Sequence, residues 1–381
     1  MIFDKVLQIY EKFYICIHCL GRMFSLLGSY TTNHERGTSL LLSTTMESHK
    51  MFLSNNDEQQ RQGLDNLKLL AEKANYLPSQ KVLRNEGIEY LTDRENQSCY
   101  LCQEIFSNIE QYITKTKKEI EGIEFDTFLV GTTPASNIIN REDKFKSELS
   151  ILEAESFKSH FNRILGKRLM EELIKSPDFN NPDLLIVYSI GKDYFRIELN
   201  PRSLFIFGKY NKLIRGIPQT HWFCNNCNGE GCKLCNFTGK QYLTSVEELI
   251  SPEFIKESRA TNSKFHGAGR EDIDVRMLGR GRPFIIELRN PKRRILDLVK
   301  IEKKVNRNNK HKIQIHDLSY SNKKEVIMLK TKAKDTRKQY LAIVKAESKI
   351  TKEEFEEKLH ELKNIFENQE IHQRTPQRVS H

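Results

Sequence analysis

The chain has 381 residues, of which 38% are hydrophobic and 29% are charged. At about 100–200 residues per domain this length suggests two domains, and the composition is that of a protein that buries real cores. No stretch reaches the roughly 18 consecutive apolar residues that a membrane helix needs, so we expect no membrane association.

The formal net charge is +10 at pH 7, and the sequence pI is about 9.0. This surplus favours a polyanionic partner, nucleic acid first, although a merely soluble basic protein would carry it too. The N-terminal segment contains Asp4 and Glu11 and lacks a small-residue cleavage site, so we expect no secretory signal. We therefore expect a monomer in the cytoplasm, where thiols stay reduced.

Helix-like and strand-like segments alternate through the first part of the chain, up to about residue 220. Apolar residues recur there at helical spacing, and short β-rich runs lie between turn residues. The predicted helices cover residues 1–15, 56–77, 103–120 and, as one long helix or a pair, 147–175. The predicted strands are IEFDTFLVG (123–131), DLLIVYSI (183–190), YFRIEL (194–199) and SLFIFG (203–208). This alternation predicts an α/β domain.

All eight cysteines fall into CxxC pairs. Two residues between thiolates let one turn present both sulfurs to a tetrahedral metal, whereas the redox alternative needs a thioredoxin-like βαβ setting that is not recognisable here. We therefore expect two structural zinc sites and no organic cofactor, since four thiolates leave no open position for catalysis. The expected ligands are Cys16, Cys19, Cys99 and Cys102 in the first site, and Cys224, Cys227, Cys232 and Cys235 in the second.

The second part of the chain is predicted to be sheet-based, with the division at the second cysteine cluster into domains 1–236 and 237–381. A helix with one apolar face is expected over residues 351–369. The basic runs PKRR (291–294) and KIEKKVNRNNKHK (300–312) are either solvated loops or phosphate contacts. The predicted strands are PFIIELRN (283–290), HKIQIHDLSY (311–320), KKEVIMLK (323–330) and RKQYLAIVKA (337–346).

The segment FHGAGREDIDVRMLGRGRPF (265–284) combines glycines, arginines and acids. Neighbouring arginines favour the ionised form of an aspartate, which can then act as a nucleophile or a base. The arginines can hold phosphates or stack on bases. A structural ion pair explains the same residues, and both interpretations stay open at this point. The glycine spacing is not that of a Walker A or dinucleotide-binding loop.

This segment resembles the active-site motif of the archaeal and eukaryotic tRNA pseudouridine synthases that have an N-terminal THUMP-type domain and modify the TΨC loop. Further stretches resemble blocks of that family in the same order. They are CIHCLGR, TNHERG, CYLC, TFLVGTTP, FGKYNKLIRGIPQTHWFCNNC, GCKLCNFTGKQY, SVEELI and RKQYLAIV. The resemblance implies an α+β fold, in which a zinc-containing THUMP-type α/β domain that binds tRNA precedes a mixed-sheet catalytic domain.

The resemblance also implies an activity and its residues. The enzyme would isomerise uridine to pseudouridine at positions 54 and/or 55 of the TΨC arm. Asp272 matches the essential aspartate, with Asp274 as the second choice, and Arg270 matches the residue that assists base flipping. Tyr340 resembles the tyrosine that packs on the uracil, although a tyrosine in a sheet core fits the same pattern. The expected substrate and phosphate contacts are Arg276, Arg280, Arg282, Lys292, Arg293 and Arg294.

In the family, the block that resembles IHQRTPQRVSH is followed by further strands and a late motif with a basic partner for the catalytic aspartate. This sequence ends at that block, so we expect a catalytic domain that is incomplete at its C-terminus. The alternative function is that of a catalytically inactive tRNA-binding protein. CNNCNGEGC also resembles the zinc repeats of co-chaperones, but no J-domain signature accompanies it.

Overall fold

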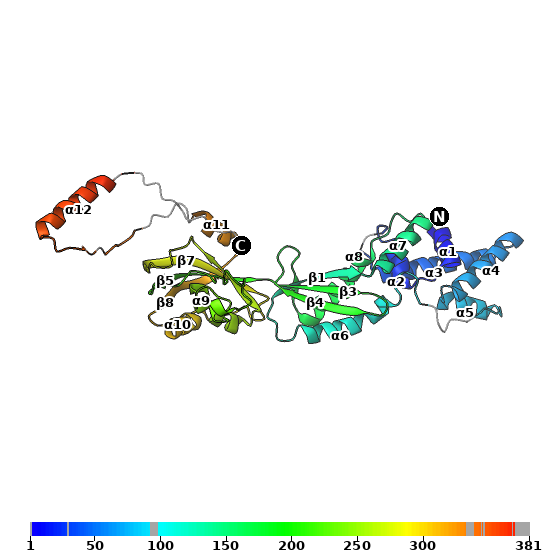
Figure 1. Ribbon diagram of the computed structural model, residues 1–381. Coiled ribbons are helices and arrows are strands. Elements are labelled where there is room, and N and C mark those ends of the chain that lie inside the picture. Colours follow the sequence, from blue (N-terminus) through cyan, green and yellow to red (C-terminus); the bar gives the residue numbers. More distant parts are fainter. Residues whose placement is uncertain are drawn as a thin grey trace. The chain divides into compact units, whose positions relative to one another are not determined.

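The computed structural model describes residues 2–28, 30–91, 98–332, 339–343, 345, 347–367 and 369. It divides into two compact units, Met1–Lys334 and Asp335–His381 (Figure 1). Among the described helices, none combines the length and the apolar composition that crossing a bilayer requires.

The first unit begins with a group of helices. A capping box starts α3, because the Thr32 side chain accepts from the Glu35 amide while the Glu35 carboxylate accepts from the Thr32 amide. Gly63 lets α3 and α4 approach closely, since a Cβ there would lie 2.3 Å from the backbone nitrogen of Phe52. These helices are α1 (Ile2–Lys12), α2 (Ile17–Met23), α3 (Asn33–Phe52), α4 (Asp57–Glu72) and α5 (Leu77–Asn85).

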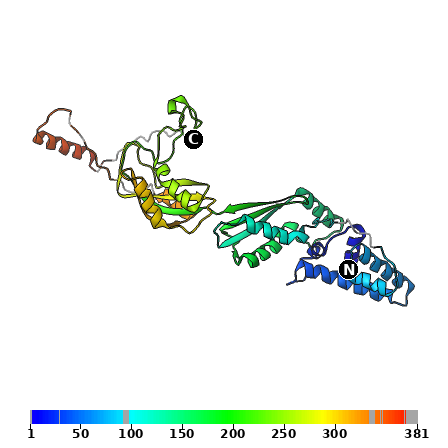
Figure 2. The same ribbon diagram turned by 90° about the horizontal axis from the view of Figure 1, so that it is seen from below.

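The first sheet has the strand order β2-β1-β3-β4, in which β1 pairs in parallel with β2 and β3, and β3 pairs antiparallel with β4. Tyr188 of β3 contacts Phe161 of α8 and hydrogen-bonds Thr116 of α6, so both helices cover the same face (Figure 2). The elements are η1 (Ile105–Asn108), α6 (Ile109–Glu119), β1 (Thr127–Pro134), α7 (Ser136–Glu148), α8 (Phe157–Leu173), β2 (Ser176–Pro177), β3 (Leu184–Ile190) and β4 (Phe195–Pro201).

The second sheet has the strand order β6-β7-β5-β8, and all its pairs are antiparallel, whereas the resemblance had led us to expect a mixed sheet. Ile301 and Val305 of α10, with Ile250 and Phe254 of α9, are buried in the core of this sheet. The elements are β5 (Leu204–Lys212), η2 (Lys233–Cys235), α9 (Val246–Ser258), β6 (Asn262–Gly267), β7 (Met277–Arg289), α10 (Leu298–Asn308), β8 (Ile313–Ser321) and α11 (Lys323–Lys332).

The α+β fold class is confirmed, but the strand SLFIFG is not part of the first domain. It is β5, and it pairs with β7 and β8 in the second sheet. The core around the first sheet extends to Leu199, and the core of the second begins at Leu204. The two sheets therefore divide at residues 202–203, while the functional division at residues 236 and 237 stays a prediction.

Three other segments differ from the prediction. KKEVIMLK forms the helix α11, in which Val326 is buried, and the basic run from residue 300 forms α10 instead of a loop. Of RKQYLAIVKA, residues 339–343 and 345 are in neither a helix nor a strand, and the rest lies outside the described residues. The predicted last helix is confirmed as α12 (Lys352–Phe366), in the second unit.

Candidate active site and metal centres

The loop between β6 and β7, residues 268–276, carries the acids of the GREDID segment. Its Glu271 side chain turns inward and is only 2% exposed. The Tyr210 hydroxyl donates to Glu271 Oε2 at 2.7 Å, and the guanidinium of Arg282 forms an ion pair with the same oxygen, from Nε, at 3.1 Å. Lys212 Nζ lies 4.0 Å from Glu271 Oε1. The Glu271 carboxylate is therefore buried among side chains of the same protein and is not presented to solvent.

Lys212 holds the backbone of the same loop from beneath. Its side chain is 0% exposed. Its ammonium group donates to the carbonyl oxygens of Asp272 at 2.9 Å, Ile273 at 3.2 Å and Ile217 at 3.1 Å. Burial lowers the pKa of Lys212, while Glu271 acts in the opposite direction. Burial, and then the charge of Glu271, raises the pKa of the Tyr210 hydroxyl well above its usual value, so the hydroxyl stays protonated as a donor.

Two further contacts fix the ends of the loop. Gln219 Nε2 donates to the carbonyl oxygen of Gly269 at 2.9 Å and to the Tyr210 hydroxyl at 2.8 Å. The amide of Gly216 donates to the carbonyl oxygen of Ile273 at 2.8 Å. The loop is thus held at Gly269, Asp272 and Ile273, while the side chains of Asp272 and Asp274 are exposed. Of the adjacent carboxylates at 271 and 272, only the second faces outward.

The GRGR stretch forms a wide bulge in β7. Tyr210 pairs with Arg282 and Lys212 with Met277, so residues 278–281 bulge out opposite Asn211. Gly279 and Gly281 adopt φ values of +68° and +75°, a backbone conformation that residues other than glycine rarely adopt. The bulge places Arg280 outside and Arg282 inside. Arg282 is 7% exposed, and its Nη1 donates to the carbonyl oxygen of Ala268 at 2.8 Å.

The predicted substrate residues are therefore not equivalent. Arg270, Arg276 and Arg280 are exposed, whereas the guanidinium of Arg282 is buried and contacts Glu271 and the carbonyl oxygen of Ala268. Tyr340 is 73% exposed and belongs to the second unit, and its contact with the substrate stays a prediction. Sequence reasoning missed Tyr210, Lys212, Gln219 and Glu271. A lysine in an apolar strand was the available signal, since burying it requires acceptors from another segment.

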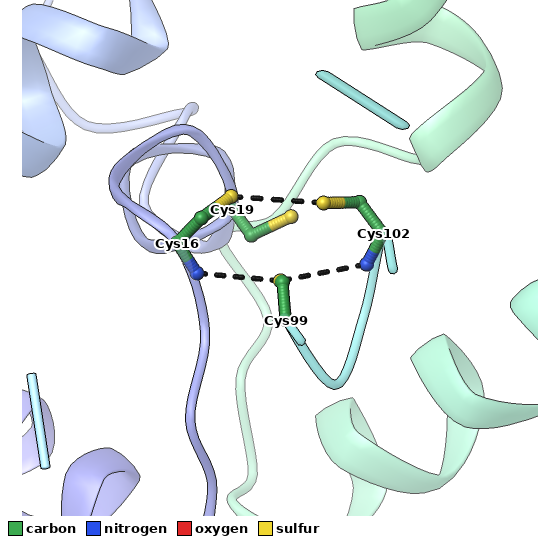
Figure 3. Close-up of side chains that lie close together, drawn as sticks. All are labelled: Cys16, Cys19, Cys99 and Cys102. Carbon is green, nitrogen blue, oxygen red and sulfur yellow. Dashed lines mark hydrogen bonds between the residues drawn. The ribbon is translucent and has the colours of Figure 1, made fainter. Parts of the chain in front are cut away.

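The first cysteine cluster joins segments distant in the chain (Figure 3). The Sγ atoms of Cys16, Cys19, Cys99 and Cys102 lie within 4.8 Å of one another, and three of these residues are buried. The Sγ atoms of Cys16 and Cys102 are 3.6 Å apart. The backbone amides of Cys16 and Cys102 donate to Cys99 Sγ at 3.3 and 3.5 Å. Amide donors favour thiolate sulfurs.

The second cluster is local and more exposed. Its sulfurs, from Cys224, Cys227, Cys232 and Cys235, also lie within 4.8 Å of one another. The backbone amides of Cys232 and Gly239 donate to Cys235 Sγ at 3.2 and 3.3 Å, and these bonds lower the pKa of the Cys235 thiol to about 6. Gly231 donates to Cys227 Sγ at 3.2 Å.

Both clusters fit a tetrahedral ion with thiolate ligands. Zn–S bonds of about 2.3 Å hold the sulfurs of a tetrahedral site about 3.8 Å apart. The shorter sulfur–sulfur distances are close to this value, at 3.6 Å for one pair in the first cluster and 3.7, 3.8 and 3.9 Å for three pairs in the second, and the others stay within 4.8 Å. The eight predicted ligands are thus brought together as two groups of four, compatible with structural zinc.

Comparisons with known proteins agree with this architecture. The family model "Pus10 THUMP domain, archaeal" matches residues 112–189, and "Pus10, C-terminal" matches residues 205–381. The tRNA pseudouridine synthase Pus10 of Methanocaldococcus jannaschii is 38% identical over 98% of this chain and 78% of its own length. That of Methanopyrus kandleri is 36% identical over 99% of this chain and 82% of its own length. This chain therefore belongs to the Pus10 family of tRNA pseudouridine synthases.

Proposed function

We propose that this protein isomerises uridine to pseudouridine at position 54, position 55 or both in the TΨC arm of tRNA. In that reaction the C1′–N1 bond breaks, the uracil turns and a C1′–C5 bond forms. The proton lost from C5 is balanced by one gained at N1, so no cofactor is consumed. Membership of the Pus10 family supports the tRNA substrate and the reaction class.

Asp272 is the proposed catalytic carboxylate. The observation that carries this assignment is the contrast within the loop. Glu271 is buried and its Oε2 is held by Tyr210 and Arg282, whereas the exposed Asp272 has its main chain fixed by Lys212. A group that reacts with a flipped nucleotide must reach outward from a rigid support. Asp272 would either bond covalently to the substrate or remove a ribose proton.

The remaining residues receive roles around that carboxylate. Extracting the target base from its stack costs about a few kcal/mol, and Arg270 would fill the place that the flipped base leaves. Arg276 and Arg280 are exposed beside the loop and would contact phosphates, and Tyr340 would pack on the uracil. For Arg282 we propose a positioning role instead of the expected RNA contact, because its partners are Glu271 and Ala268.

The N-terminal region would hold the tRNA, with zinc at the first cysteine cluster stabilising it and zinc at the second shaping residues 224–235. We propose that residues 1–236 bind the tRNA and residues 237–381 carry the catalytic residues, with Tyr210, Lys212 and Gln219 of the first range supporting the catalytic loop. The proposed protein is a monomer that works in the cytoplasm. The alternative of an inactive tRNA-binding protein would leave the buried support beneath Asp272 without a purpose. The relatives matched over most of their length are named as synthases.

The test is pseudouridine formation on an unmodified tRNA transcript by the 381-residue chain, its Asp272→Ala variant and its Asp274→Ala variant. We expect product from the first and the third and none from the second. All three should bind tRNA within about two-fold of one another, because neither carboxylate contributes positive charge to the RNA contact. Loss of turnover in Asp274→Ala alone would transfer the catalytic role to Asp274. Turnover by Asp272→Ala at the normal rate would refute the mechanism.

A further inference from the structure

A short segment after β7, residues 290–296, contacts the domain of the first sheet; we call it the strap. The backbone amide of Glu124 donates to the carbonyl oxygen of Lys292 at 2.8 Å. In return, the amides of Arg294 and Ile295 donate to Glu124 Oε2 at 2.7 and 3.1 Å. Glu124 precedes β1, so these bonds connect the second sheet's chain to the start of the first sheet.

Arg294 is the centre of the contact. Its side chain is 13% exposed, and it was expected to contact RNA phosphate. Instead, its Nη1 donates to the carbonyl oxygen of Arg202 at 2.6 Å, and its Nη2 lies 3.2 Å from Asp183 Oδ1. Arg202 lies in the two-sheet junction at residues 202–203, so the strap reinforces the covalent connection.

Asp183 continues the network into the first sheet. Its Oδ1 accepts from Arg202 Nη2 at 2.6 Å, and its Oδ2 accepts from the amides of Asp126 and Thr127 at 3.1 and 3.3 Å. Burial acts to raise the pKa of Asp183, but the bond from Arg202 and the other donors lower it. The carboxylate is therefore ionised at neutral pH and joins β1, β3 and the strap.

The other side of the strap is anchored to the second sheet's domain. The amides of Lys292 and Arg293 both donate to the carbonyl oxygen of Ser258, at 3.0 and 2.8 Å, at the end of α9. The amide of Leu296 donates to the Tyr320 hydroxyl of β8 at 2.7 Å. Leu296 itself is part of the second core. The strap is thus fixed at both ends and joins two separate cores.

We propose that Arg294 is a positioning residue, and that the strap holds the domain of the first sheet at a fixed orientation to the loop that carries Asp272. This inference rests on the proposed function, in which the first domain holds tRNA while the loop receives the target uridine. Two sites that share one ligand gain affinity only when their geometry permits simultaneous contact. If the two domains move relative to one another, ordering them each time the RNA binds costs free energy and lowers the affinity.

The test compares two RNAs: a full-length tRNA transcript, which reaches both domains, and an isolated TΨC stem–loop, which reaches only the catalytic one. Arg294→Met should weaken binding of the full-length tRNA about ten-fold, because it removes part of the affinity that two linked sites provide. It should change binding of the stem–loop by less than about two-fold. Arg289→Met is the matched control, because that arginine side chain is exposed, pairs only with Glu287 of the same strand among the described ion pairs, and lies outside the strap. Glu124→Gln, which keeps the shape of the strap contact, should act in the same direction as Arg294→Met.

Hydrogen exchange separates positioning from direct RNA contact. In free Arg294→Met protein, the amides of Asp126 and Thr127, which donate to Asp183, should exchange faster than in the unsubstituted chain. Equal weakening on both RNAs, or weaker tRNA binding with unchanged exchange, would overturn the proposal in favour of a phosphate contact. Unchanged binding of both RNAs would overturn it as well. These measurements need no turnover, so a chain that forms no pseudouridine would refute the proposed activity and still decide the role of Arg294.

Discussion

Glu271 and Asp272 are neighbouring carboxylates with opposite surroundings. The inward residue completes a network with Tyr210 and Arg282, and the outward one is presented to solvent. Because the two side chains point to opposite sides of the loop, one acid can support the loop while the next one is free to react. The resemblance pointed to Asp272, but the residue pattern by itself did not predict the supporting role of Glu271, because both acids lie in the same charged segment.

Replacing Glu271 by Gln tests the supporting role. The change leaves Lys212 and Arg282 buried without their anionic partner, and breaking a buried pair in this way costs about 3–5 kcal/mol. We expect a lower thermal midpoint, measured by circular dichroism, and slower pseudouridine formation. Asp274→Asn removes an exposed charge from the same loop and should leave the midpoint within about 1 °C, since exposed substitutions change stability by under about 0.5 kcal/mol. An unchanged midpoint for Glu271→Gln would mean that the network contributes no stability.

His160 is a second buried polar residue with a measurable consequence. It packs against Phe106 with ring centroids 4.4 Å apart, and its Nδ1 has no hydrogen-bond partner among the described residues. Burial, and next the charge of Arg22, lowers the pKa of His160 to about 2 from its ordinary value of 6.5. The folded protein therefore keeps this imidazole neutral at pH values where the unfolded chain protonates it.

The stability that this residue contributes is present above pH 6.5 and is lost as pH falls below it. The loss is about 1.4 kcal/mol per pH unit, or about 2 kcal/mol between pH 6.5 and 5. His160→Phe should remove that part of the pH dependence in urea unfolding, whereas His34→Phe, at an exposed position, should retain it. Parallel pH profiles for the unsubstituted protein and His160→Phe would show that His160 is protonated in the folded state.

At the scale of elements, local periodicity identified most helices and strands but not their partners. SLFIFG is a strand as expected, yet its place in the second sheet depends on pairing with β7 and β8, which are remote in sequence. KKEVIMLK has β-branched and apolar residues typical of a strand, but it forms the helix α11, in which Val326 is buried. Tertiary context overrides such short propensities.

In the candidate sites, too, local patterns were predictable from the sequence and contacts between distant segments were not. Spacing alone predicted both groups of metal ligands, since CxxC pairs are a local signal. The support of Asp272 was not predicted. Lys212 in an apolar strand signals burial, but its partners are far away in the chain, and Glu271 resembles a surface charge. The same limit applies to PKRR, where Arg294 turned out to contact Asp183 and Arg202. A buried cation differs from a solvated one only through acceptors that come from other segments.

The two cysteine clusters should respond differently to loss of a ligand. Cys16 and Cys99 are 83 residues apart, and Cys19, Cys99 and Cys102 are part of the first core. Closing so long a loop is entropically costly, and metal affinity contributes directly to folding there. Cys99→Ser should therefore lower the thermal midpoint strongly, while Cys232→Ser, in the local and exposed cluster, should lower it little. Each variant should retain about one zinc per chain by elemental analysis. Equal midpoints would contradict this ranking.

At the scale of the whole molecule, the net charge of +10 is partly concentrated on one helix. The buried side of α10 carries Ile301 and Val305, and its other side carries basic residues at helical spacing. Lys300, Lys303 and Arg307 are exposed and line an open hollow, whereas Lys304 is paired with Glu257 at 2.5 Å. We predict that this stripe contacts the sugar–phosphate backbone of RNA, although Asp297 lines the same hollow and Glu257 interacts with Lys300.

The salt dependence of tRNA binding tests that surface. Each phosphate contact releases condensed counterions, so the slope of log K against log salt changes by roughly 0.7–0.9 per contact. The triple variant Lys300→Ala, Lys303→Ala and Arg307→Ala should flatten the slope by about two and weaken binding most at low salt. Lys304→Ala is the matched control, because its ammonium already has a carboxylate partner and should change the slope little. Parallel lines for the triple variant and the unsubstituted protein would place the tRNA backbone elsewhere, since a charge that contacts no phosphate releases no counterion.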